Sequence, residues 1–299
     1  MVIPLDQRPR SGPYSGLNAR SAKRFLTQAF TEGGLPFAEE DALELVLDAT
    51  GLDRTTLMLR GTEFLAPEVF DKIKDGMARR LAGEPVDYIL GWREFYGRRF
   101  VISKDVLSPR ADTETLIRET LKALKHVPAP RLLDLGTGSG AIGLTLLAEL
   151  PEATLVATDL SEPALNIARQ NAKALNVQDR VIFAQGAWWN ALDPTETFDA
   201  IVSNPPYIDA AAMTQLEPEV ANYDPALALH GGEDGLRDYR AILTQAAAYL
   251  RPRGWLGLEI GFDQGESVST LVRTAEFSNI QVHRDLGGND RVISARKST

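Results

Sequence analysis

The sequence predicts an α/β protein in which a small helical domain precedes a seven-stranded sheet, parallel except for a terminal antiparallel hairpin. Three observations lead to this prediction. Apolar residues recur at helical spacing in the first third of the 299-residue chain, and strand-like and helix-like segments alternate after residue 131. The last two strand-like segments are joined by a connection too short for a parallel crossover.

The composition is that of an ordinary globular protein and excludes several kinds of site. Apolar residues make up 44% of the chain, and no apolar run approaches the roughly 18 residues of a membrane span. Cysteine is absent, which excludes disulfides, thiolate nucleophiles and cysteine-ligated metal sites. The net charge of −9 opposes attraction to nucleic acid, and the N-terminal segment lacks the apolar stretch of a secretory signal. We therefore expect a cytoplasmic monomer without a metal, a membrane anchor or a nucleic-acid partner.

The N-terminal part of the chain divides into a tail and a helical domain. Residues 1–20 are rich in Pro, Gly, Ser and Arg without periodicity, so we expect a flexible tail. Residues 21–91 carry apolar residues at helical spacing in three places, which predicts a small helical domain. The best marked of these helices starts at Pro67 and ends before the Gly-Glu-Pro sequence at residues 83–85.

Residues 92–107 predict a β-hairpin linker before the larger domain, residues 108–299. Two short apolar runs flank Arg98 and Arg99, a pattern typical of a hairpin. A helix is expected to begin at Pro109 and to open the larger domain.

The alternation of strands and helices defines the larger domain. The predicted strands are residues 131–135, 154–158, 181–184, 200–203, 255–260, 280–283 and 291–295. The predicted helices between them lie near residues 142–150, 163–175 and 236–250. Because most of these strands are nearly continuous apolar runs, we expect a parallel sheet covered on both faces.

A glycine-rich loop after the first predicted strand indicates a nucleotide-containing ligand. Its candidate contact residues are Gly136, Thr137, Gly138, Ser139 and Gly140. Glycines there permit a tight turn and a close approach of the backbone to the ligand. The same stretch also fits a dinucleotide fingerprint, so a nicotinamide enzyme or a nucleotide-binding module without catalysis remains open.

An acidic residue stands at the end of the second predicted strand. Asp159 follows the glycine loop by about twenty residues, where a carboxylate can accept hydrogen bonds from both hydroxyls of a ribose. We therefore expect Asp159 to bind the ribose of the ligand.

Four residues after the strand 200–203 form the candidate catalytic and substrate-binding loop: Asn204, Pro205, Pro206 and Tyr207. The two prolines fix two φ angles and offer no N–H, so the loop presents mainly acceptors. Acceptors from the Asn204 side chain and the Pro205 carbonyl suit a planar NH2 group, and the Tyr207 ring can stack on an amide or a base. Catalysis would then rest on positioning, with no need for a metal.

These motifs carry a resemblance to a known class of enzymes. The pattern Asp134-x-Gly136-x-Gly138-x-Gly140 resembles the first motif of methyltransferases that use S-adenosylmethionine and have a Rossmann-like seven-strand sheet. The Asn-Pro-Pro-Tyr loop resembles that of the members acting on planar amino groups. The resemblance implies S-adenosylmethionine as cofactor, held by the glycine loop, Asp159, Asn204 and an adenine-stacking Trp188.

Further motifs are similar to those of the peptide chain release factor glutamine methyltransferases. They lie at residues 83–91, 94–97, 107–114 and 231–236, in the order typical of that family. This resemblance implies methylation of the amide nitrogen (N5) of the glutamine in the Gly-Gly-Gln motif of class I peptide chain release factors. It also implies that the helical N-terminal domain recognises the substrate. The alternatives are an adenine N6-amino methyltransferase acting on DNA or RNA and a ribosomal-protein glutamine methyltransferase.

The chain departs from the family pattern at two positions. Ala187 stands where an acidic residue commonly precedes the tryptophan, which removes a hydrogen bond to the adenine. Ala111 stands where a proline commonly follows Pro109-Arg110, which should loosen the start of the helix without removing Arg110 or Glu114. Glu259, at the end of the fifth predicted strand, could face the site or cap the edge of the sheet.

Overall fold

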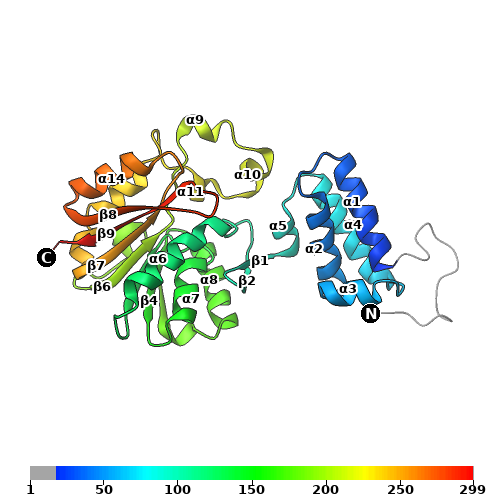
Figure 1. Ribbon diagram of the computed structural model, residues 1–299, viewed down its shortest axis with the longest axis horizontal. Coiled ribbons are helices and arrows are strands. Elements are labelled where there is room, and N and C mark those ends of the chain that lie inside the picture. The colour runs from blue at the N-terminus through cyan, green and yellow to red at the C-terminus, as the bar shows by residue number, and fades with distance from the viewer. Residues whose placement is uncertain (1–17, 299) are drawn as a thin grey trace. The chain divides into compact units, whose positions relative to one another are not determined.

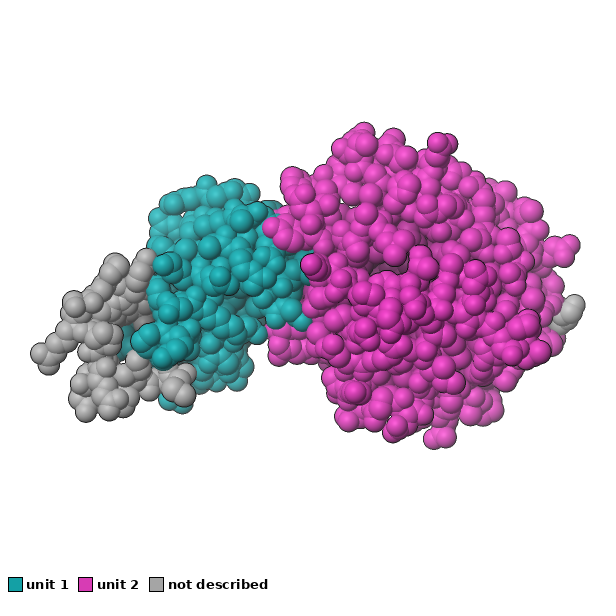
Figure 2. All heavy atoms as spheres, turned by 180° about the vertical axis from the view of Figure 1, so that it is seen from behind, with its two compact units in different colours: residues 1–91 teal, residues 92–299 magenta. Residues whose placement is uncertain are grey.

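The computed structural model describes residues 18–298, and the chain divides into two compact units, Met1–Gly91 and Trp92–Thr299 (Figure 2). Most of the tail predicted over residues 1–20 lies outside the described residues. Residues 18–20 do not belong to a tail, because they cap and begin the first helix. None of the helices within residues 18–298 has the length and apolar character of a membrane span.

Helices form the described part of the first unit. They are α1 (Ala19–Glu32), α2 (Ala38–Thr50), α3 (Arg54–Arg60), α4 (Pro67–Leu81) and α5 (Val86–Leu90). The helix α1 starts earlier than predicted because Asn18 and Ser21 form a reciprocal capping box. The apolar faces of α1 and α2 meet in a core that includes Leu26, Phe30 and Val46. The short helices α3 and α5 span 7 and 5 residues, too few to produce a clear apolar period.

The second unit opens with the predicted hairpin, whose turn lies before Arg98. The strands β1 (Trp92–Phe95) and β2 (Arg98–Val101) pair antiparallel, so Arg98 and Arg99 lie in a strand. The turn consists of Tyr96 and Gly97, with φ angles of 51° and 68°. Two consecutive positive φ angles match the twist that two-residue hairpins require.

The helix expected from Pro109 begins later than predicted. Arg110 has an extended backbone, and a 3-10 turn, η2 (Ala111–Thr113), comes before α6 (Glu114–Leu124). The departure at Ala111 therefore falls in a short turn rather than in the helix.

A seven-stranded sheet forms the core of this unit, as predicted (Figure 1). Its strands are β3 (Arg131–Leu135), β4 (Thr154–Asp159), β5 (Val181–Gln185), β6 (Phe198–Ser203), β7 (Leu250–Glu259), β8 (Phe277–Arg284) and β9 (Asp290–Lys297). The strand order is β5-β4-β3-β6-β7-β9-β8. Only β9 runs antiparallel to its neighbours, β7 and β8, so the parallel sheet and the antiparallel terminal hairpin are both confirmed.

The helix predicted near residues 236–250 is divided in the structure. It consists of α12 (Arg237–Leu243) and α13 (Ala246–Tyr249), and β7 already begins at Leu250. The first half of β7 contains Pro252 and Gly254, which resemble a turn in the sequence and hide the start of the strand.

The remaining helical segments connect the strands. They are α7 (Ala141–Glu149), α8 (Glu162–Ala174), η3 (Gln178–Arg180), η4 (Trp188–Ala191), α9 (Ala210–Met213), α10 (Pro218–Tyr223), α11 (Ala226–Leu229) and α14 (Gly265–Thr274).

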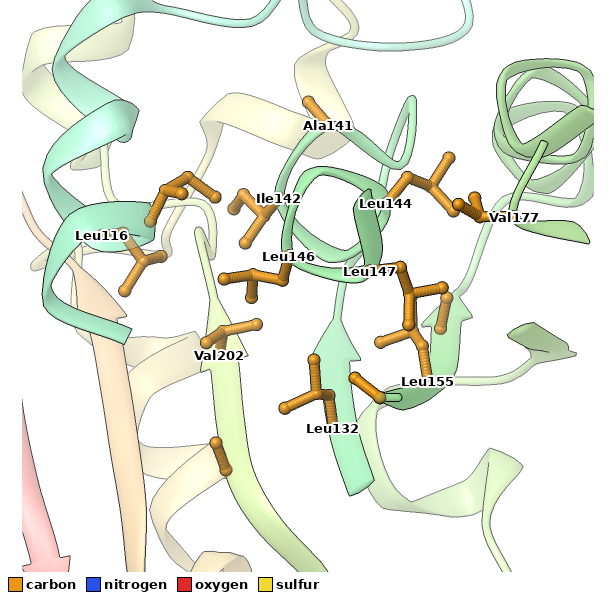
Figure 3. Close-up of a cluster of buried hydrophobic side chains, with 14 of the residues drawn as sticks. Leu116, Leu132, Ala141, Ile142, Leu144, Leu146, Leu147, Leu155, Val177 and Val202 are labelled. Carbon is orange, nitrogen blue, oxygen red and sulfur yellow. The ribbon is translucent and has the colours of Figure 1, made fainter. Parts of the chain in front are cut away.

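Two apolar cores lie on the two faces of the sheet. Successive residues of β3 point to opposite faces, so Leu132 packs in one core and Leu133 in the other. In the first core, Leu146 of α7 lies above Leu132 of β3 and Val202 of β6 (Figure 3). Helices on both faces bury the parallel strands and leave polar chemistry to their ends.

Asn171 of α8 holds two segments of the second unit together. Its fully buried side chain donates to the carbonyl oxygens of Val101 at 2.9 Å and Ser139 at 2.8 Å. Its Oδ1 also accepts from the Val101 N–H at 2.7 Å. One amide side chain therefore ties the hairpin and the glycine loop to α8.

Replacing Asn171 by alanine is expected to lower the free energy of unfolding by about 2–4 kcal/mol, because the change leaves buried backbone groups without partners. Urea denaturation measures this loss. Gln170→Ala, at an exposed position of the same helix, is the matched control and should change stability by less than about 0.5 kcal/mol. Equal effects of the two substitutions would contradict this role of Asn171.

Candidate active site

The register of the sheet aligns the ends of four neighbouring parallel strands, β4, β3, β6 and β7. Leu135 of β3 pairs with Thr158 of β4 and Ser203 of β6, and Ser203 pairs with Leu258 of β7. The residues that follow these partners are Gly136, Asp159, Asn204 and Glu259. Because parallel strands end at the same edge, these residues leave the sheet side by side.

A cavity of about 380 Å³ lies at this edge, within the second unit. The predicted site residues that line it are Gly136, Thr137, Gly138, Ser139, Asp159, Trp188, Asn204 and Pro206. Three further predicted residues do not line it, namely Gly140, Pro205 and Tyr207. The structure therefore brings the glycine loop and two residues of the Asn-Pro-Pro-Tyr loop to one cavity.

The glycine loop needs its glycines for conformation and for space. Gly136 and Gly138 have φ angles of 70° and 56°, in the left-handed region that side chains rarely adopt. A Cβ on Gly136 would lie 3.6 Å from the ring of Trp188, whereas a Cβ on Gly138 would meet no atom within 4 Å. The loop thus leaves open space over Gly138, where a ligand can approach the backbone closely.

Asp134 supports the glycine loop from the interior. Its Oδ2 accepts from the Thr137 hydroxyl at 2.7 Å and from the Gly143 N–H at 3.0 Å. Its Oδ1 is buried and is without a hydrogen-bond partner. Burial raises the pKa of Asp134 to about 6, although the two hydrogen bonds favour the charged form. The acidic residue of the first motif is therefore a brace under the loop, because it does not line the cavity.

Asp159 faces the cavity from the end of β4. Its Oδ2 accepts from the Gly138 N–H at 2.8 Å and its Oδ1 from the Ser161 N–H at 2.9 Å. Burial raises the pKa of this carboxyl group, against the effect of these backbone donors. An ionised carboxylate offers about four lone-pair sites, so Asp159 keeps acceptor capacity for a ribose hydroxyl besides its backbone donors.

The two neighbouring tryptophans have different roles. Trp189 is buried, donates from Nε1 to the Ala241 carbonyl at 3.0 Å and stacks on Tyr249, with ring centroids 4.8 Å apart. Trp188 lines the cavity and has a φ angle of 47°, a strained conformation for an aromatic residue. Of the two rings, Trp188 is thus the one available for stacking on a ligand, beside Ala187, which also lines the cavity.

The Asn-Pro-Pro-Tyr loop is held by glycines whose role could not be predicted from the sequence. A Cβ on Gly235 would lie 2.4 Å from the Tyr207 carbonyl oxygen, and one on Gly231 would lie 2.7 Å from the Pro206 carbonyl oxygen. Gln264 also donates to the Tyr207 carbonyl at 3.0 Å. The motif at residues 231–236 therefore packs against the backbone of the loop.

Tyr207 does not line the cavity, so stacking of its ring on the substrate stays a prediction. It packs against the core that contains Tyr239 and Ile260. Burial and the negative charge of Glu259 raise the pKa of Tyr207 to about 12, although Arg291 and Arg110 act in the opposite direction. Its phenol therefore stays neutral at physiological pH and does not serve as a base.

Glu259 lies behind the wall of the cavity. Thr113 and Asn204, which both line the cavity, act on its carboxyl group and favour the charged form. The residue is 2% exposed, and its Oε2 is buried without a hydrogen-bond partner. Burial raises the pKa of Glu259 to about 7. The sequence left open whether Glu259 faces the site or caps the edge of the sheet, and the structure favours the placement toward the site.

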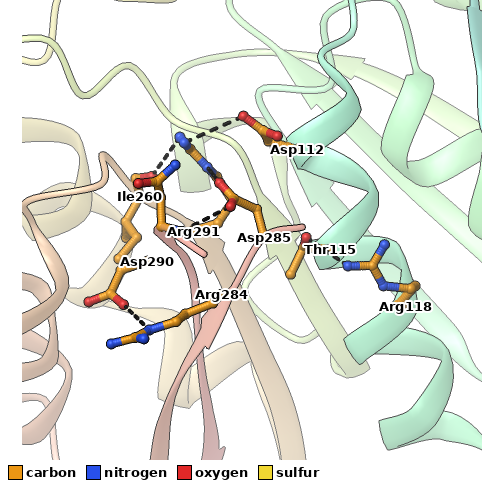
Figure 4. A network of polar contacts seen from close by, with 9 residues as sticks. Asp112, Thr115, Arg118, Ile260, Arg284, Asp285, Asp290 and Arg291 are labelled. Atoms are coloured by element: carbon orange, nitrogen blue, oxygen red, sulfur yellow. Dashed lines mark hydrogen bonds and ion pairs between the residues drawn. The ribbon is translucent and has the colours of Figure 1, made fainter. Parts of the chain in front are cut away.

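Arg291 supplies positive charge next to Glu259 and Tyr207. Its guanidinium contacts Asp285 at 3.2 Å and Asp112 at 3.5 Å, as Figure 4 shows. Its positive charge lowers the pKa values of both Glu259 and Tyr207, against the effect of burial. These ion pairs connect β9 with the segment before it and with the turn before α6.

Arg110 and Glu114 have separate partners. Arg110 lines the cavity and forms an ion pair with Asp224 at 2.8 Å. Glu114 accepts from the Tyr96 N–H at 3.2 Å, which fixes the hairpin turn. Arg110 and Glu114 thus hold two different segments of the second unit, and only Arg110 lines the cavity.

The raised pKa of Asp134 predicts a pH dependence of stability. Its charged form is disfavoured in the folded state, so its contribution is fully present below its ordinary pKa of 3.8 and is lost as the pH rises through about 6. Relative to Asp134→Asn, the free energy of unfolding of the unmodified protein should fall by about 2 kcal/mol from about pH 4 to about pH 7. Urea denaturation at a series of pH values tests this, and a pH-independent difference would contradict it.

Comparisons with known proteins identify the family of both units. Residues 108–221 match the family model of the methyltransferase small domain, and residues 21–91 match that of the PrmC N-terminal domain. Among solved structures, a methyltransferase from Pyrococcus furiosus has a TM-score of 0.50 at 18% identity, covering 76% of this chain and 100% of that one. The hMettl16 catalytic domain has a TM-score of 0.53 at 18% identity, covering 79% and 82%. At such identities the likeness shows a shared fold.

Two curated relatives are much closer in sequence. A release factor glutamine methyltransferase of Cereibacter sphaeroides is 44% identical over 94% of this chain and 99% of its own length. One of Bradyrhizobium diazoefficiens is 43% identical over 96% of this chain and 97% of its own length. The identity extends over the helical unit as well as the sheet, and the chain therefore belongs to the family of release factor glutamine methyltransferases.

Proposed function

We propose that this protein transfers a methyl group from S-adenosylmethionine to the side-chain amide nitrogen (N5) of the glutamine in the Gly-Gly-Gln motif of class I peptide chain release factors. The observation that carries the proposal is the single cavity lined by both the glycine loop and Asn204. A donor site and an acceptor for a planar NH2 group thus lie within one cavity. Membership of the family supports the identity of the substrate.

The residues of the cavity fit the cofactor. Open space over Gly138 admits the ligand, Asp159 retains acceptor sites for the ribose, and the Trp188 ring is available for the adenine. When bound, S-adenosylmethionine supplies an electrophilic methyl group on a positively charged sulfur. The chain holds it with Gly136, Thr137, Gly138, Ser139 and Asp159, and Gly140 sets the turn into α7.

The acceptor side works by positioning a weak nucleophile. An amide nitrogen is a poor nucleophile because its lone pair is delocalised into the carbonyl group. Two acceptors, the Asn204 Oδ1 and the Pro205 carbonyl oxygen, would hold the two hydrogens and aim the nitrogen at the donor. Pro206 stiffens this corner, and the neutral Tyr207 shapes the loop from outside the cavity. Orientation of this kind can lower a barrier by several kcal/mol. Forming the N–C bond would break the S–C bond of the donor, and the nitrogen would then lose one of its two protons to water.

The two units have different roles in the proposed reaction. The helical unit, residues 21–91, recognises the release factor, and residues 108–299 bind the cofactor and carry out the transfer. Transfer to adenine N6 is not favoured, since the close relatives are named for release factor glutamine and the chain carries a net charge of −9. The same names speak against a ribosomal-protein substrate and a nicotinamide enzyme.

Methyl transfer can be located directly. Purified protein incubated with methyl-labelled S-adenosylmethionine and a release factor should label the glutamine of the Gly-Gly-Gln motif, as read by peptide mass spectrometry. Asn204→Ala should reduce the rate by about 100-fold or more, because it removes an acceptor from the site of charge development. A parallel sample of DNA and RNA should stay unlabelled, and label on nucleic acid alone would overturn the proposal.

Cofactor binding provides a second prediction. Asp159→Asn should weaken S-adenosylmethionine about 10- to 100-fold in calorimetry, because charge-assisted hydrogen bonds to the ribose are lost. Asp179→Asn, an exposed carboxylate in the turn before β5, is the control and should bind like the unmodified protein. Unchanged binding by the Asp159 variant would remove this residue from the cofactor site.

A further inference from the structure

We propose that Glu259 is a positioning residue that fixes the orientation of the Asn204 side-chain amide, so that its Oδ1 faces the cavity and its NH2 group faces the protein. This inference rests on the proposed function, since the oriented Oδ1 is the acceptor for the substrate amide. It assigns a task to a buried carboxylate that contacts neither cofactor nor substrate directly.

The geometry places Glu259 behind the two groups that it holds. Glu259 follows Leu258, the register partner of Ser203, so it leaves the sheet next to Asn204. Leu258 packs in one of the two cores, so the side chain of Glu259 points to the opposite face of β7. Asn204 and Thr113 act on its carboxyl group, and both of these residues line the cavity, whereas Glu259 does not. Its Oε2 is buried without a hydrogen-bond partner. Its carboxylate therefore reaches the reaction only through these two residues.

An asparagine amide can be turned in two ways, and only one suits the reaction. Its carbonyl oxygen accepts hydrogen bonds and its NH2 group donates them. An ionised carboxylate only accepts, so a charged Glu259 requires Asn204 to present its NH2 group inward and its Oδ1 to the cavity. A protonated Glu259 can donate, which also permits the opposite orientation. That orientation would present N–H groups to the N–H groups of the substrate amide.

The surroundings of Glu259 decide when it is charged. The ionisable groups that act on it or touch it are Asp112 of η2, Arg291 of β9, Tyr207 of the loop after β6 and Tyr239 of α12. Tyr239 donates to the backbone carbonyl of Glu259 at 2.9 Å, and the pKa of its phenol is raised well above the ordinary value. The pKa of Tyr207 is about 12, so both phenols remain neutral. Burial sets the pKa of Glu259 at about 7, opposed by Thr113 and Arg291, so this carboxyl group titrates in the working range of pH.

The charged form of Glu259 is the one that orients Asn204 for the reaction. Because a raised pKa means that this form is reached only above about pH 7, the rate of transfer should rise with pH through that region. Glu259→Gln is a close mimic of the protonated acid, since a glutamine side chain both donates and accepts.

The test measures kcat and KM with a release factor between about pH 5.5 and about pH 9. For the unmodified protein, kcat should rise with an apparent pKa near 7. Glu259→Gln should lower kcat at about pH 8 by about tenfold or more, abolish this rise and leave the KM for S-adenosylmethionine within about twofold. Thr113→Val should move the rise to higher pH, because it removes a hydrogen bond that favours the charged carboxylate.

A matched control separates this role from a general effect of removing a carboxylate. Glu119→Gln changes a partly buried carboxylate of α6 that does not line the cavity, and it should keep both the kcat and the pH profile. Circular dichroism checks that each variant is folded. A folded Glu259→Gln protein with an unchanged kcat, or with a reduced kcat and the same pH profile, would overturn the proposal.

A readout without catalysis keeps the inference distinct from the proposed function. In protein labelled with ¹⁵N-asparagine, the side-chain signal of Asn204, identified with an Asn204→Ala sample, should titrate near pH 7 and stop titrating in Glu259→Gln. A signal that does not titrate would refute the role of Glu259 even in an active enzyme. If the Asn204 signal titrates but the protein methylates no release factor, the proposed substrate is refuted and the role of Glu259 is not.

Discussion

The parallel register of β3, β4, β6 and β7 is the constraint on which the whole site depends. Leu135, Thr158, Ser203 and Leu258 lie on one level of the sheet, so the next residue of each strand emerges at the same edge. Four segments that are far apart in the sequence thereby contribute one glycine, two carboxylates and one amide to a single region. A register shift by one residue would turn every side chain to the opposite face of the sheet. The apolar cores on both faces therefore fix the register, and with it the positions of these four residues.

The site is maintained at a cost in stability. Asp134 and Glu259 are buried carboxyl groups with raised pKa values, and each has one oxygen without a hydrogen-bond partner. Such groups oppose folding when they ionise, so a purely structural role would be better served by neutral side chains. Asp134 holds the glycine loop and Glu259 holds Asn204, and Trp188 keeps a strained backbone between them. These departures from the usual rules of packing coincide with the predicted donor and acceptor regions.

The sequence predicts the features that local pattern determines, and the structure corrects those that depend on tertiary contacts. The apolar strand before Gly136 and the acidic end of β4 can be identified from composition and spacing alone. The short helices α3 and α5, the turn at Tyr96 and the early start of β7 cannot, because capping, positive φ angles or pairing with a neighbour decide them. The position of Tyr207 outside the cavity and the contact of Glu259 with Asn204 depend on the register between strands, which a single sequence does not reveal.

The central claim is that one cavity brings the donor and a glutamine amide together through Asn204. A crystal structure with the demethylated cofactor and a Gly-Gly-Gln peptide would test it most directly. The glutamine amide nitrogen should lie within hydrogen-bond distance of the Asn204 Oδ1 and the Pro205 carbonyl oxygen, with the cofactor between Asp159 and Trp188. A glutamine bound outside the cavity, or a cofactor that does not contact the glycine loop, would contradict the account.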